Sequence, residues 1–574
     1  MKYIFSLPSP FERFVSIEIQ IGKEHTATEF ELQLPAWRPG RYELGNFAKN
    51  IRDFKVVDAS GAPVPHQKVT KDLWSIAACS GPATVTYSYF ASQPDAGACW
   101  VDHDQLYINP IHCCMYIPGR ENEKCEVSLN VPATWKVATG MKQTGPHQFE
   151  TNDYHQLVDC PFIASPNLQH GEYTVDNIPF HIWIQGECKP DWLRIIKDFE
   201  AFTQVQLNTM KHFPATEFHF LVQILPFPFY HGVEHTNSTV LAMGPGYRMM
   251  KPEFYNDFMG VASHELFHVW NVKTIRPAEM QPYDYTRENY AETGYVYEGV
   301  TTYYGDLFLA RSGYFTLEGL LEEYSVRLQK HMDNPGRFNH GVAQSSFDTW
   351  LDGYVPGIPG RKVSIYDEGC LIAWMLDFMI RSATDSSRSL DNVMQALYYD
   401  FAQKGRGYTA EDFRHLCEAA AGRNFDAFFD QFVYAPATLN GLLSEVASLA
   451  GITIEESPSP LANERLSGIR VESRGGSVFV ASVFPGSPGA LAGLVKDDEI
   501  LAVNKVRVEN NLSDLVSYFG SSSSGYQLTI ASGKKLRDVH ISQSDTNWMG
   551  KFRLVSQDQL SLPQLRFRQQ WLQH

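Results

Sequence analysis

The spacing of apolar residues changes twice along this chain, and those changes limit the folds open to it. In the first 170 or so residues, stretches such as Val15–Ile21 and Ala83–Phe90 alternate in character, which is typical of half-buried strands. From about residue 190, segments such as Trp192–Lys211 and Leu317–Met332 place apolar residues three and four apart, which indicates helices. Short strands return beyond Glu456–Gly468, a segment rich in Pro, Ser and charge.

The length of 574 residues allows three or four domains at roughly 100–200 residues each. Together with the changes of period, it predicts a multidomain α+β protein. Residues 1–170 are expected to form a β-sandwich-like domain, and residues 171–450 a mostly helical domain that begins with a small α/β unit. Strands are expected again at 456–546, with an exposed loop at the serine run 521–524, and then a tail at 547–574 with little periodicity.

The charge balance excludes one large class of partner. Lys and Arg number 48 against 65 for Asp and Glu, so the formal net charge is -17. Nucleic acid is a poor match, because its phosphates require clustered Lys and Arg. A cationic group, such as the terminal amine of a peptide, suits this chain better.

Cysteine usage and hydropathy bear on the compartment. Nine cysteines are scattered along the chain without a CxxC pair, which favours a reducing compartment. No run of about 18 apolar residues is present, and prolines and charges interrupt the N-terminal apolar stretch. These features predict a cytoplasmic protein with no membrane span, although a removed signal peptide would leave the same trace.

The segment HELFH, from His264 to His268, is the sharpest sign of chemistry. On a helix, residues four apart share a face, so both imidazoles can reach one metal ion, and Glu265 can reach a water on that metal without being a ligand. Catalytic zinc takes three protein ligands and an open position, where the pKa of its water falls to roughly 7. Such a motif arises by chance here with a probability on the order of 4%, so it needs support from elsewhere.

A third ligand is expected from a second helix. The helix-compatible segment YVYEGVTTYYG contains Glu298, with a glycine behind it and aromatic and threonine residues around it. Glu288, Glu292 and Asp306 are competing carboxylates nearby. A single glutamate on a helix is more often a solvated residue, so spacing alone leaves the choice open.

Further segments give the chain a resemblance to a known family. HELFHVWNVKTIRP followed by YEGVTTYY resembles the glycyl aminopeptidase family of zinc peptidases, metallopeptidase family sixty-one, a group of gluzincins whose ligands are two histidines and a later glutamate. Pro35–Ile51 resembles the family's WxPGxY signature, His231–Thr239 its GGxEH segment and Tyr366–Asp377 its YxKGxxxxxxLD helix. Phe484–Val508 is similar to the bacterial PDZ pattern, a domain that the family commonly carries. The resemblance implies a thermolysin-like catalytic domain at 171–450 and a PDZ domain at 456–546.

Carried over residue by residue, the resemblance implies one zinc ion per chain, bound by His264, His268 and Glu298. Glu265 would take a proton from the zinc-bound water as it attacks the peptide carbonyl, and would return it to the leaving amine. The zinc and the Tyr366 hydroxyl would stabilise the oxyanion. Read without the resemblance, Tyr366 is an ordinary aromatic residue on a helix face.

The GGxEH segment would bind the substrate on an edge strand beside the metal, through Gly232 and Glu234. Glu234 would pair with the free α-ammonium of the substrate, and this pairing makes an aminopeptidase rather than an endopeptidase. Without the resemblance, Glu234 is an ordinary charged residue on an edge strand. A PDZ domain binds a peptide C-terminus by adding a strand to its edge and holding the carboxylate on backbone N–H groups. The alternative is a module that packs on the peptidase and binds no free peptide. The expected carboxylate loop consists of Gly468, Ile469, Arg470 and Val471.

Three positions depart from the family pattern. The first glycine of GGxEH is His231, which would either crowd the first pocket or alter the edge of the strand. The lysine of YxKG is Glu368, which would add negative charge near the site. The position four after Glu298 is Thr302, so the carboxylate that orients a ligand imidazole in thermolysin-like enzymes must come from elsewhere.

The sequence therefore predicts a zinc-dependent aminopeptidase, and the family alone implies its preference for small N-terminal residues, Gly or Ala. Its partners would be peptides with a free N-terminus and a peptide C-terminus at the PDZ domain. The rivals are a metalloendopeptidase or broad aminopeptidase, and a non-catalytic PDZ adaptor with a structural metal site. The adaptor is disfavoured because Glu265, Tyr366 and all three expected ligands are present together.

Overall fold

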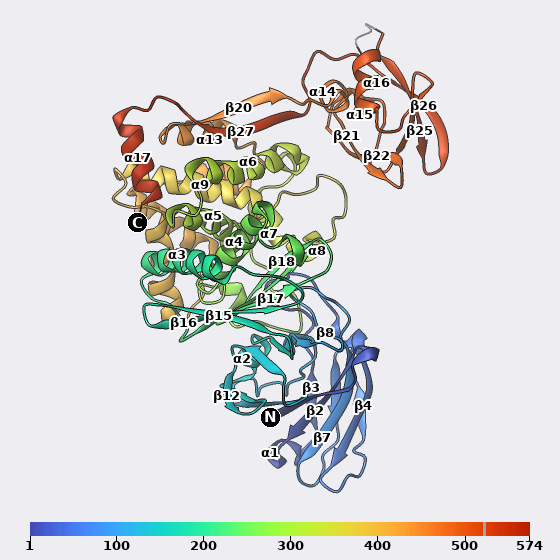
Figure 1. Cartoon of the computed structure of the whole chain (residues 1–574), viewed down its shortest axis with the longest axis vertical. Helices are drawn as coiled ribbons and strands as arrows, with labels where there is room; N and C mark the ends of the chain where they lie inside the picture. The colour runs from blue at the N-terminus through green and yellow to red at the C-terminus, as the bar shows by residue number, and fades with distance from the viewer. Residues whose placement is uncertain (521–523, 574) are drawn as a thin grey trace.

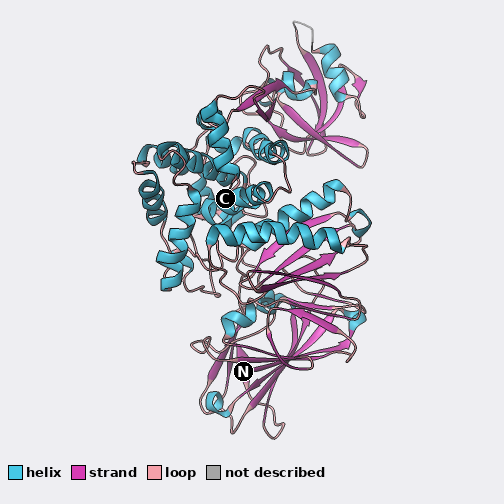
Figure 2. Ribbon diagram, turned by 60° about the vertical axis from the view of Figure 1, so that its left-hand side comes forward, coloured by secondary structure: helices cyan, strands magenta, loops and turns pink. Residues whose placement is uncertain are grey.

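The structure, a computed structural model, describes residues 1–520 and 524–573. Three bodies follow one another along its long axis: a β domain at the N-terminal end, a helix-rich domain in the middle and a small β domain at the other end (Figure 1). Helices gather in the middle and strands lie mostly toward the two ends (Figure 2). This is the expected multidomain α+β architecture. Of the serine run expected to be a loop, residues 521–523 lie outside the described residues.

The N-terminal domain is built by alternating burial, as the period of two predicts. In β2 (Phe14–Ile21) and β7 (Ala83–Phe90) every second side chain is buried. The main sheet has the order β12 (Lys142–Gly145), β13 (Gln148–Thr151), β10 (Cys125–Asn130), β1 (Lys2–Ser9), β2, β7 and β4 (Ile51–Asp58). Two smaller sheets share its apolar core: β11 (Lys136–Thr139), β14 (Phe162–Ser165), β9 (Leu106–Ile108) and β8 (Trp100–Val101), and β3 (Phe30–Gln33), β6 (Leu73–Ile76) and β5 (His66–Lys68). The short helices are α1 (Lys23–Thr26) and α2 (Tyr154–Val158).

A five-stranded sheet joins the N-terminal domain to the helices. Its order is β15 (Gln169–Val175), β16 (Ile178–Gln185), β17 (Phe218–Ile224), β19 (Ser238–Gly244) and β18 (Phe229–Glu234). One face shares a large apolar core with the helices, and α3 (Trp192–Met210) crosses from β16 to the parallel strand β17. The other face packs on the N-terminal domain, where Leu221 and Val240 meet Tyr107 and Ile163. β18 is left at the edge of the sheet, beside α4 (Pro252–Phe267).

The helices of the middle domain form where the spacing of apolar residues predicted them. The one expected at Tyr255–Val272 is α4, which ends at Phe267 because a run of turns begins at His268. No helix in the described part of the chain is long and apolar enough to cross a membrane. The others are α5 (Thr301–Arg311), α6 (Leu317–Asp333), α7 (Val342–Phe347), α8 (Thr349–Asp352), α9 (Asp367–Ala383), α10 (Leu390–Ala396), α11 (Ala410–Ala421), α12 (Asp426–Phe428) and α13 (Asn440–Ser448).

The small C-terminal domain is held by a two-stranded ribbon. β20 (Ile452–Pro458) and β27 (Gly550–Ser556) pair antiparallel, so the chain enters and leaves this domain side by side. The ribbon lies on α6, where Gln329 accepts a hydrogen bond from the backbone of Phe552. The domain contains the sheet β21 (Ile469–Arg474), β22 (Ser477–Val483), β23 (Glu499–Val503), β25 (Tyr526–Ser532) and β26 (Lys535–Ile541), with β24 (Val506–Arg507) on β23, and α14 (Ala462–Ser467), α15 (Pro488–Leu491) and α16 (Leu512–Phe519).

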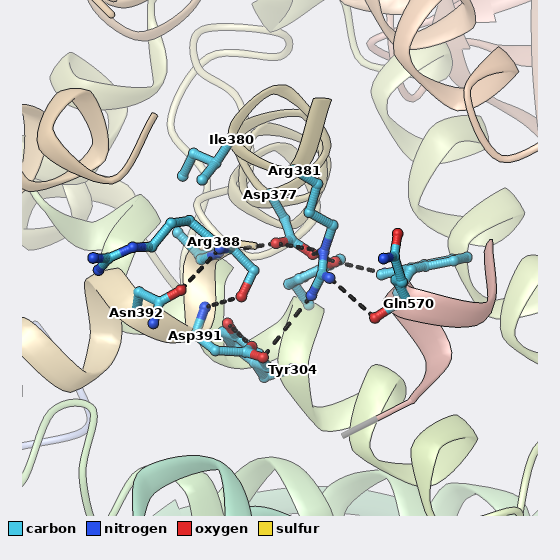
Figure 3. A network of polar contacts seen from close by, with 12 residues as sticks. Tyr304, Asp377, Ile380, Arg381, Arg388, Asp391, Asn392 and Gln570 are labelled. Carbon is cyan, nitrogen blue, oxygen red and sulfur yellow. Dashed lines mark hydrogen bonds and ion pairs between the residues drawn. The ribbon is translucent and has the colours of Figure 1, made fainter. Parts of the chain in front are cut away.

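The last helix, α17 (Leu562–Leu572), returns to the middle domain (Figure 1). Trp571 is fully buried there, and its indole N–H donates to the Tyr303 hydroxyl at 2.9 Å. Arg381 of α9 donates to the backbone carbonyl of Gln570 at 3.0 Å and also pairs with Asp377 (Figure 3). These contacts order residues that show little periodicity in the sequence. We propose domain limits at 1–170, 171–450 and 456–546, with the ribbon and α17 belonging by contact to the middle domain.

Candidate active site

Two imidazoles meet where α4 ends. His264 lies in the last turn of α4 and His268 directly follows it, so the pair keeps the spacing of one helix face. Their Nε2 atoms are 2.9 Å apart. Nδ1 of His268 donates to the backbone carbonyl of Asn271 at 2.5 Å, which leaves Nε2 to face His264. Burial acts to lower the pKa of His268, but Glu298 outweighs it and raises that pKa to about 10, so a metal ion bound here would displace a proton from Nε2. The hydrogen bond to the carbonyl of Asn271 orients the ring of His268. The sequence shows no carboxylate for this orienting role.

Glu298 is carried by a π-helical turn, η6 (Tyr295–Val300), that leads into α5. Its Oε2 lies 3.8 Å and 3.4 Å from the Nε2 atoms of the two histidines. The backbone of this turn is pressed against α9, since a Cβ on Gly299 would lie 2.4 Å from the Cα of Gly369. Glycine at this contact allows the close approach that keeps Glu298 beside the histidines.

The three donor atoms fit a small metal ion. Their separations of 2.9, 3.4 and 3.8 Å suit ligands held about 2.0–2.2 Å from one tetrahedral centre. Of the competing carboxylates, Asp306 lies on the wall of the same cavity, whereas Glu288 and Glu292 do not line it. Burial, and then the neighbouring His268, lower the pKa of His264 to about 4, so this ring is neutral and able to bind a metal at neutral pH.

The donor set lines a cavity of about 920 Å³. Its walls come from α4, β18, α5, α6 and the beginning of α9. The N-terminal domain closes one side with Gly40 and Arg41, which belong to the segment that carries the WxPGxY signature. The site is therefore completed by two domains.

Glu265 lies next to His264, buried in the wall of this cavity. Its Oε2 has no hydrogen-bond partner among the described residues, and burial raises the pKa of its carboxyl well above the usual value. A Cβ on Gly232 would lie 2.1 Å from Oε1 of Glu265, so glycine is what lets β18 pass this close. A carboxyl with a raised pKa and an oxygen without a partner is suited to accept and release a proton near neutral pH.

Glu234, the last residue of β18, is a second buried carboxylate with an oxygen that lacks a hydrogen-bond partner in the described part of the chain. The N-terminal domain covers it: Gly40 has a φ of +81°, and a Cβ there would lie 2.5 Å from Oε2 of Glu234. Potential ligand atoms of Glu234, Glu265 and His268 lie within 4.8 Å of one another. This carboxylate therefore offers a place for a cationic group directly beside the candidate metal ligands.

Tyr366 lines the cavity from the position that precedes α9. Burial, and then the charge of Glu298, raise the pKa of its hydroxyl well above the usual value. Tyr366 therefore keeps its proton at neutral pH and can donate a hydrogen bond into the cavity.

The three departures from the family pattern have different consequences. His231 lines the cavity, and burial followed by the nearby Arg38 lowers its pKa to about 4, so it is a neutral ring there. Glu368 does not line the cavity, contrary to the expectation of added negative charge at the site; its carboxylate meets Nδ1 of His331 at 2.5 Å instead. Thr302 donates its hydroxyl to the carbonyl of Glu298 at 2.8 Å, within the helix.

Asp159 is a residue that sequence reasoning missed. It comes from the N-terminal domain and holds the turn that follows Glu234, accepting from the backbone N–H of Thr236 at 2.8 Å and contacting Nδ1 of His235 at 3.1 Å. The buried ammonium of Lys273 donates to it at 2.7 Å. Burial acts to raise the pKa of Asp159, but Lys273 and His235 outweigh it and hold that pKa well below 3.8. No local spacing could reveal this contact, because its partners lie far along the chain.

We predict that Asp159→Asn destabilises the protein by about 1–3 kcal/mol, because the buried Lys273 loses its counter-charge. The lowered pKa means that the wild-type contribution is present above pH 3.8 and is lost as the pH falls through the folded-state value. Urea unfolding measures the loss, and an increase in KM for a substrate with a free amine would report the loosened turn. Asp284→Asn, which removes a partner of the exposed Arg287, is the control and should change stability by less than about 1 kcal/mol. Equal losses in the two variants would refute the role of Asp159.

The expected PDZ carboxylate loop lies where α14 ends and β21 begins. Gly468 adopts a φ of +64° after α14, and Ile469 is the first residue of β21. β21 pairs with β22 on one side and is the first strand of the sheet order. Arg470 forms an ion pair at 2.8 Å with Asp333 of α6, so one side chain of the loop is committed to the middle domain, while Val471 continues the strand.

Three family models match the chain: the Peptidase M61 N-terminal domain over residues 2–166, the M61 glycyl aminopeptidase over residues 257–372 and the PDZ domain over residues 458–530. No curated protein matches it. Among solved structures, an aminopeptidase N family protein from Idiomarina loihiensis shares the fold over 100% of both chains, with 24% identity and a TM-score of 0.91. An M1 zinc metallopeptidase from Deinococcus radiodurans, bound to a Tyr-Ser-Ala substrate, is 12% identical over 76% of this chain and 94% of its own, with a TM-score of 0.47.

The family matches, together with the donor set in the cavity, define a metallo-aminopeptidase, a hydrolase. The chain belongs to the M61 glycyl aminopeptidase family and carries the family's N-terminal domain and a PDZ domain. The resemblance seen in the sequence motifs is thereby confirmed.

Proposed function

We propose that this protein is a zinc-dependent enzyme that removes single residues from the N-termini of peptides. One zinc ion per chain would be held by His264, His268 and Glu298, since two imidazoles and a carboxylate suit zinc better than calcium or magnesium. The observation that carries the proposal is the Glu234 carboxylate, which has an oxygen without a hydrogen-bond partner among the described residues and lies within 4.8 Å of a ligand atom of His268. An α-ammonium bound there leaves room for about one residue before the reacting carbonyl.

The residues of the chain divide the chemistry among them. Zinc, when bound, supplies a Lewis acid and lowers the pKa of water. Glu265 accepts the proton of the attacking water on its carboxylate and delivers it to the nitrogen of the leaving amine. Tyr366 donates its hydroxyl to the substrate oxygen on which negative charge develops. Glu234 accepts hydrogen bonds from the substrate ammonium, and Gly232 leaves the edge of β18 open for the substrate backbone.

In this proposal small N-terminal residues, glycine or alanine, are cleaved best. The description of the matching family supports the preference. The ring of His231 also supports it, because it lines the cavity on the same strand as Glu234, at a position where the family pattern has glycine. A bulky first side chain would compete with this ring for space.

The PDZ domain is proposed to bind the C-terminus of a peptide along β21, with the loop Gly468–Val471 holding the carboxylate. The place of β21 at the end of the sheet order supports this, because its outer edge is where a strand could add. We also propose that the protein works in the cytoplasm. The nine unpaired cysteines support a reducing compartment.

Hydrolysis of Gly-, Ala- and Leu-p-nitroanilide, with N-acetyl-Ala-p-nitroanilide as the blocked substrate, tests the proposal. We expect the glycyl and alanyl compounds to be cut fastest and the blocked one to be resistant, because it has no ammonium for Glu234. Chelation should abolish turnover, and added zinc should restore it. Glu234→Gln should reduce the discrimination against the blocked substrate. If the wild-type protein cleaves the blocked substrate as fast as the unblocked alanyl compound, the protein is an endopeptidase. If zinc is bound but no substrate is cleaved, the PDZ adaptor is the better account.

A further inference from the structure

A second cluster of metal-ligating side chains lies on the five-stranded sheet, outside the active site. Antiparallel pairing of β15 with β16 places Glu172 opposite His181. His170 precedes Glu172 by two residues, so both point to the same face of β15. Parallel pairing of β16 with β17 places His219 opposite His181 on the other side. Trp183, which follows His181 by two residues, packs toward the N-terminal domain, so the cluster occupies the sheet face opposite α3.

Three of these side chains bring donor atoms close to one another. Nε2 of His170 and Nδ1 of His181 are 3.2 Å apart, and Oε2 of Glu172 lies 3.6 Å from the same Nδ1. All three residues offer ligand atoms within 4.8 Å of one another. The ring of His170 is stacked on Trp183 with centroids 3.8 Å apart, which fixes its orientation. The separations of 3.2 and 3.6 Å resemble those between the donor atoms of the active site.

The choice between two possible groups of ligands follows from the contacts of the rings. His181 also belongs to a second group, with Glu217 and His219. There, however, Nδ1 of His219 accepts the indole N–H of Trp183 at 3.2 Å, so Nδ1 carries no proton and Nε2 does. His219 therefore has no lone pair directed at Glu217, and the first group is the better ligand set.

We propose that His170, Glu172 and His181 bind a second divalent transition-metal ion, with Zn²⁺ as the expected occupant. Two imidazoles and one carboxylate are ligands that zinc accepts, and water would complete the coordination. The ion would link β15, the strand at the end of the sheet order, to β16, and so would hold this edge of the sheet. Because His170 and Glu172 are exposed, we expect it to bind more weakly than the ion of the active site. The inference does not depend on the proposed peptidase mechanism.

Equilibrium dialysis of the full-length protein against Zn²⁺, with zinc per chain as the readout, tests the proposal. We expect two ions per wild-type chain, and one when His264 and His268 are both replaced by Ala. Adding His170→Ala to that double variant should remove the remaining ion, and Glu172→Gln should weaken it. The matched control is His103→Ala, since His103 is another exposed histidine with a carboxylate, Asp104, at 3.2 Å. It should leave the zinc content unchanged.

Hydrogen exchange provides a second readout that does not rely on activity. In the double variant that lacks the active-site histidines, Zn²⁺ should slow exchange of the amides of β15 and β16, and His170→Ala should remove this effect. The proposal is overturned if the double variant binds no zinc. It is also overturned if the His170→Ala and His103→Ala variants bind the same amount of zinc at every zinc concentration in the dialysis. That result would mean that the ion lies elsewhere.

Discussion

Replacing Glu265 by Gln is expected to lower kcat for an alanyl substrate by about 10²–10⁴-fold while the zinc stays bound. Gln has the shape of Glu, so the close contact with Gly232 persists. Its amide, however, cannot take a proton at the position where the carboxylate oxygen has no hydrogen-bond partner in the described structure. Steady-state kinetics and the zinc content of the same preparations measure the two halves of this prediction.

Glu323→Gln is the matched control for this experiment. Glu323 lies on α6, in the wall of the same cavity, and burial raises the pKa of its carboxyl as it does for Glu265. Since Glu323 is outside the donor set, its substitution is expected to change kcat far less. Similar losses of kcat in both variants, or loss of zinc from Glu265→Gln, would contradict the assignment of Glu265 as the base.

Trp571→Ala is expected to reduce the free energy of unfolding by about 3–5 kcal/mol. The indole is fully buried, packs against Phe378 with centroids 4.9 Å apart and donates to the Tyr303 hydroxyl. Removing it leaves a cavity between α17 and the middle domain and a lost hydrogen bond. Urea unfolding followed by circular dichroism measures the loss, and limited proteolysis tests whether α17 detaches.

Leu562→Ala provides the comparison on the same helix, because Leu562 is 71% exposed. Its substitution removes little buried surface and is expected to cost less than about 1 kcal/mol. If Trp571→Ala is no more destabilising than Leu562→Ala, then α17 does not contribute to the stability of the middle domain, and the packing of the C-terminal segment described above is wrong.

The proximity of the proposed metal ligands could be expected from the sequence, because the information that places them is partly local. The four-residue spacing of His264 and His268 needs only a helix to bring both rings to one face. Glu298 was one of several carboxylates on the sequence. Its place beside the histidines depends on the π-helical turn and on the contact between Gly299 and Gly369, which come from different helices.

Other parts of the site have no local pattern at all. Asp159 and Gly40 belong to the N-terminal domain, yet one holds the turn after Glu234 and the other covers its carboxylate. The carbonyl of Asn271 orients a ligand imidazole, and backbone groups carry no sequence signature. The position of α17 likewise depends on the buried pocket for Trp571, which other helices form.

By itself, then, the sequence determined the period of each segment, the helix face that carries the histidines and the family to which the motifs belong. These features depend on residues a few positions apart, and backbone geometry converts such spacing directly into a shared face. Only the tertiary structure decided how Glu298 comes to lie beside the two histidines, how the N-terminal domain closes the cavity and where the second histidine cluster lies. Those depend on packing between distant segments, where buried contacts and strand register, rather than spacing, bring the side chains together.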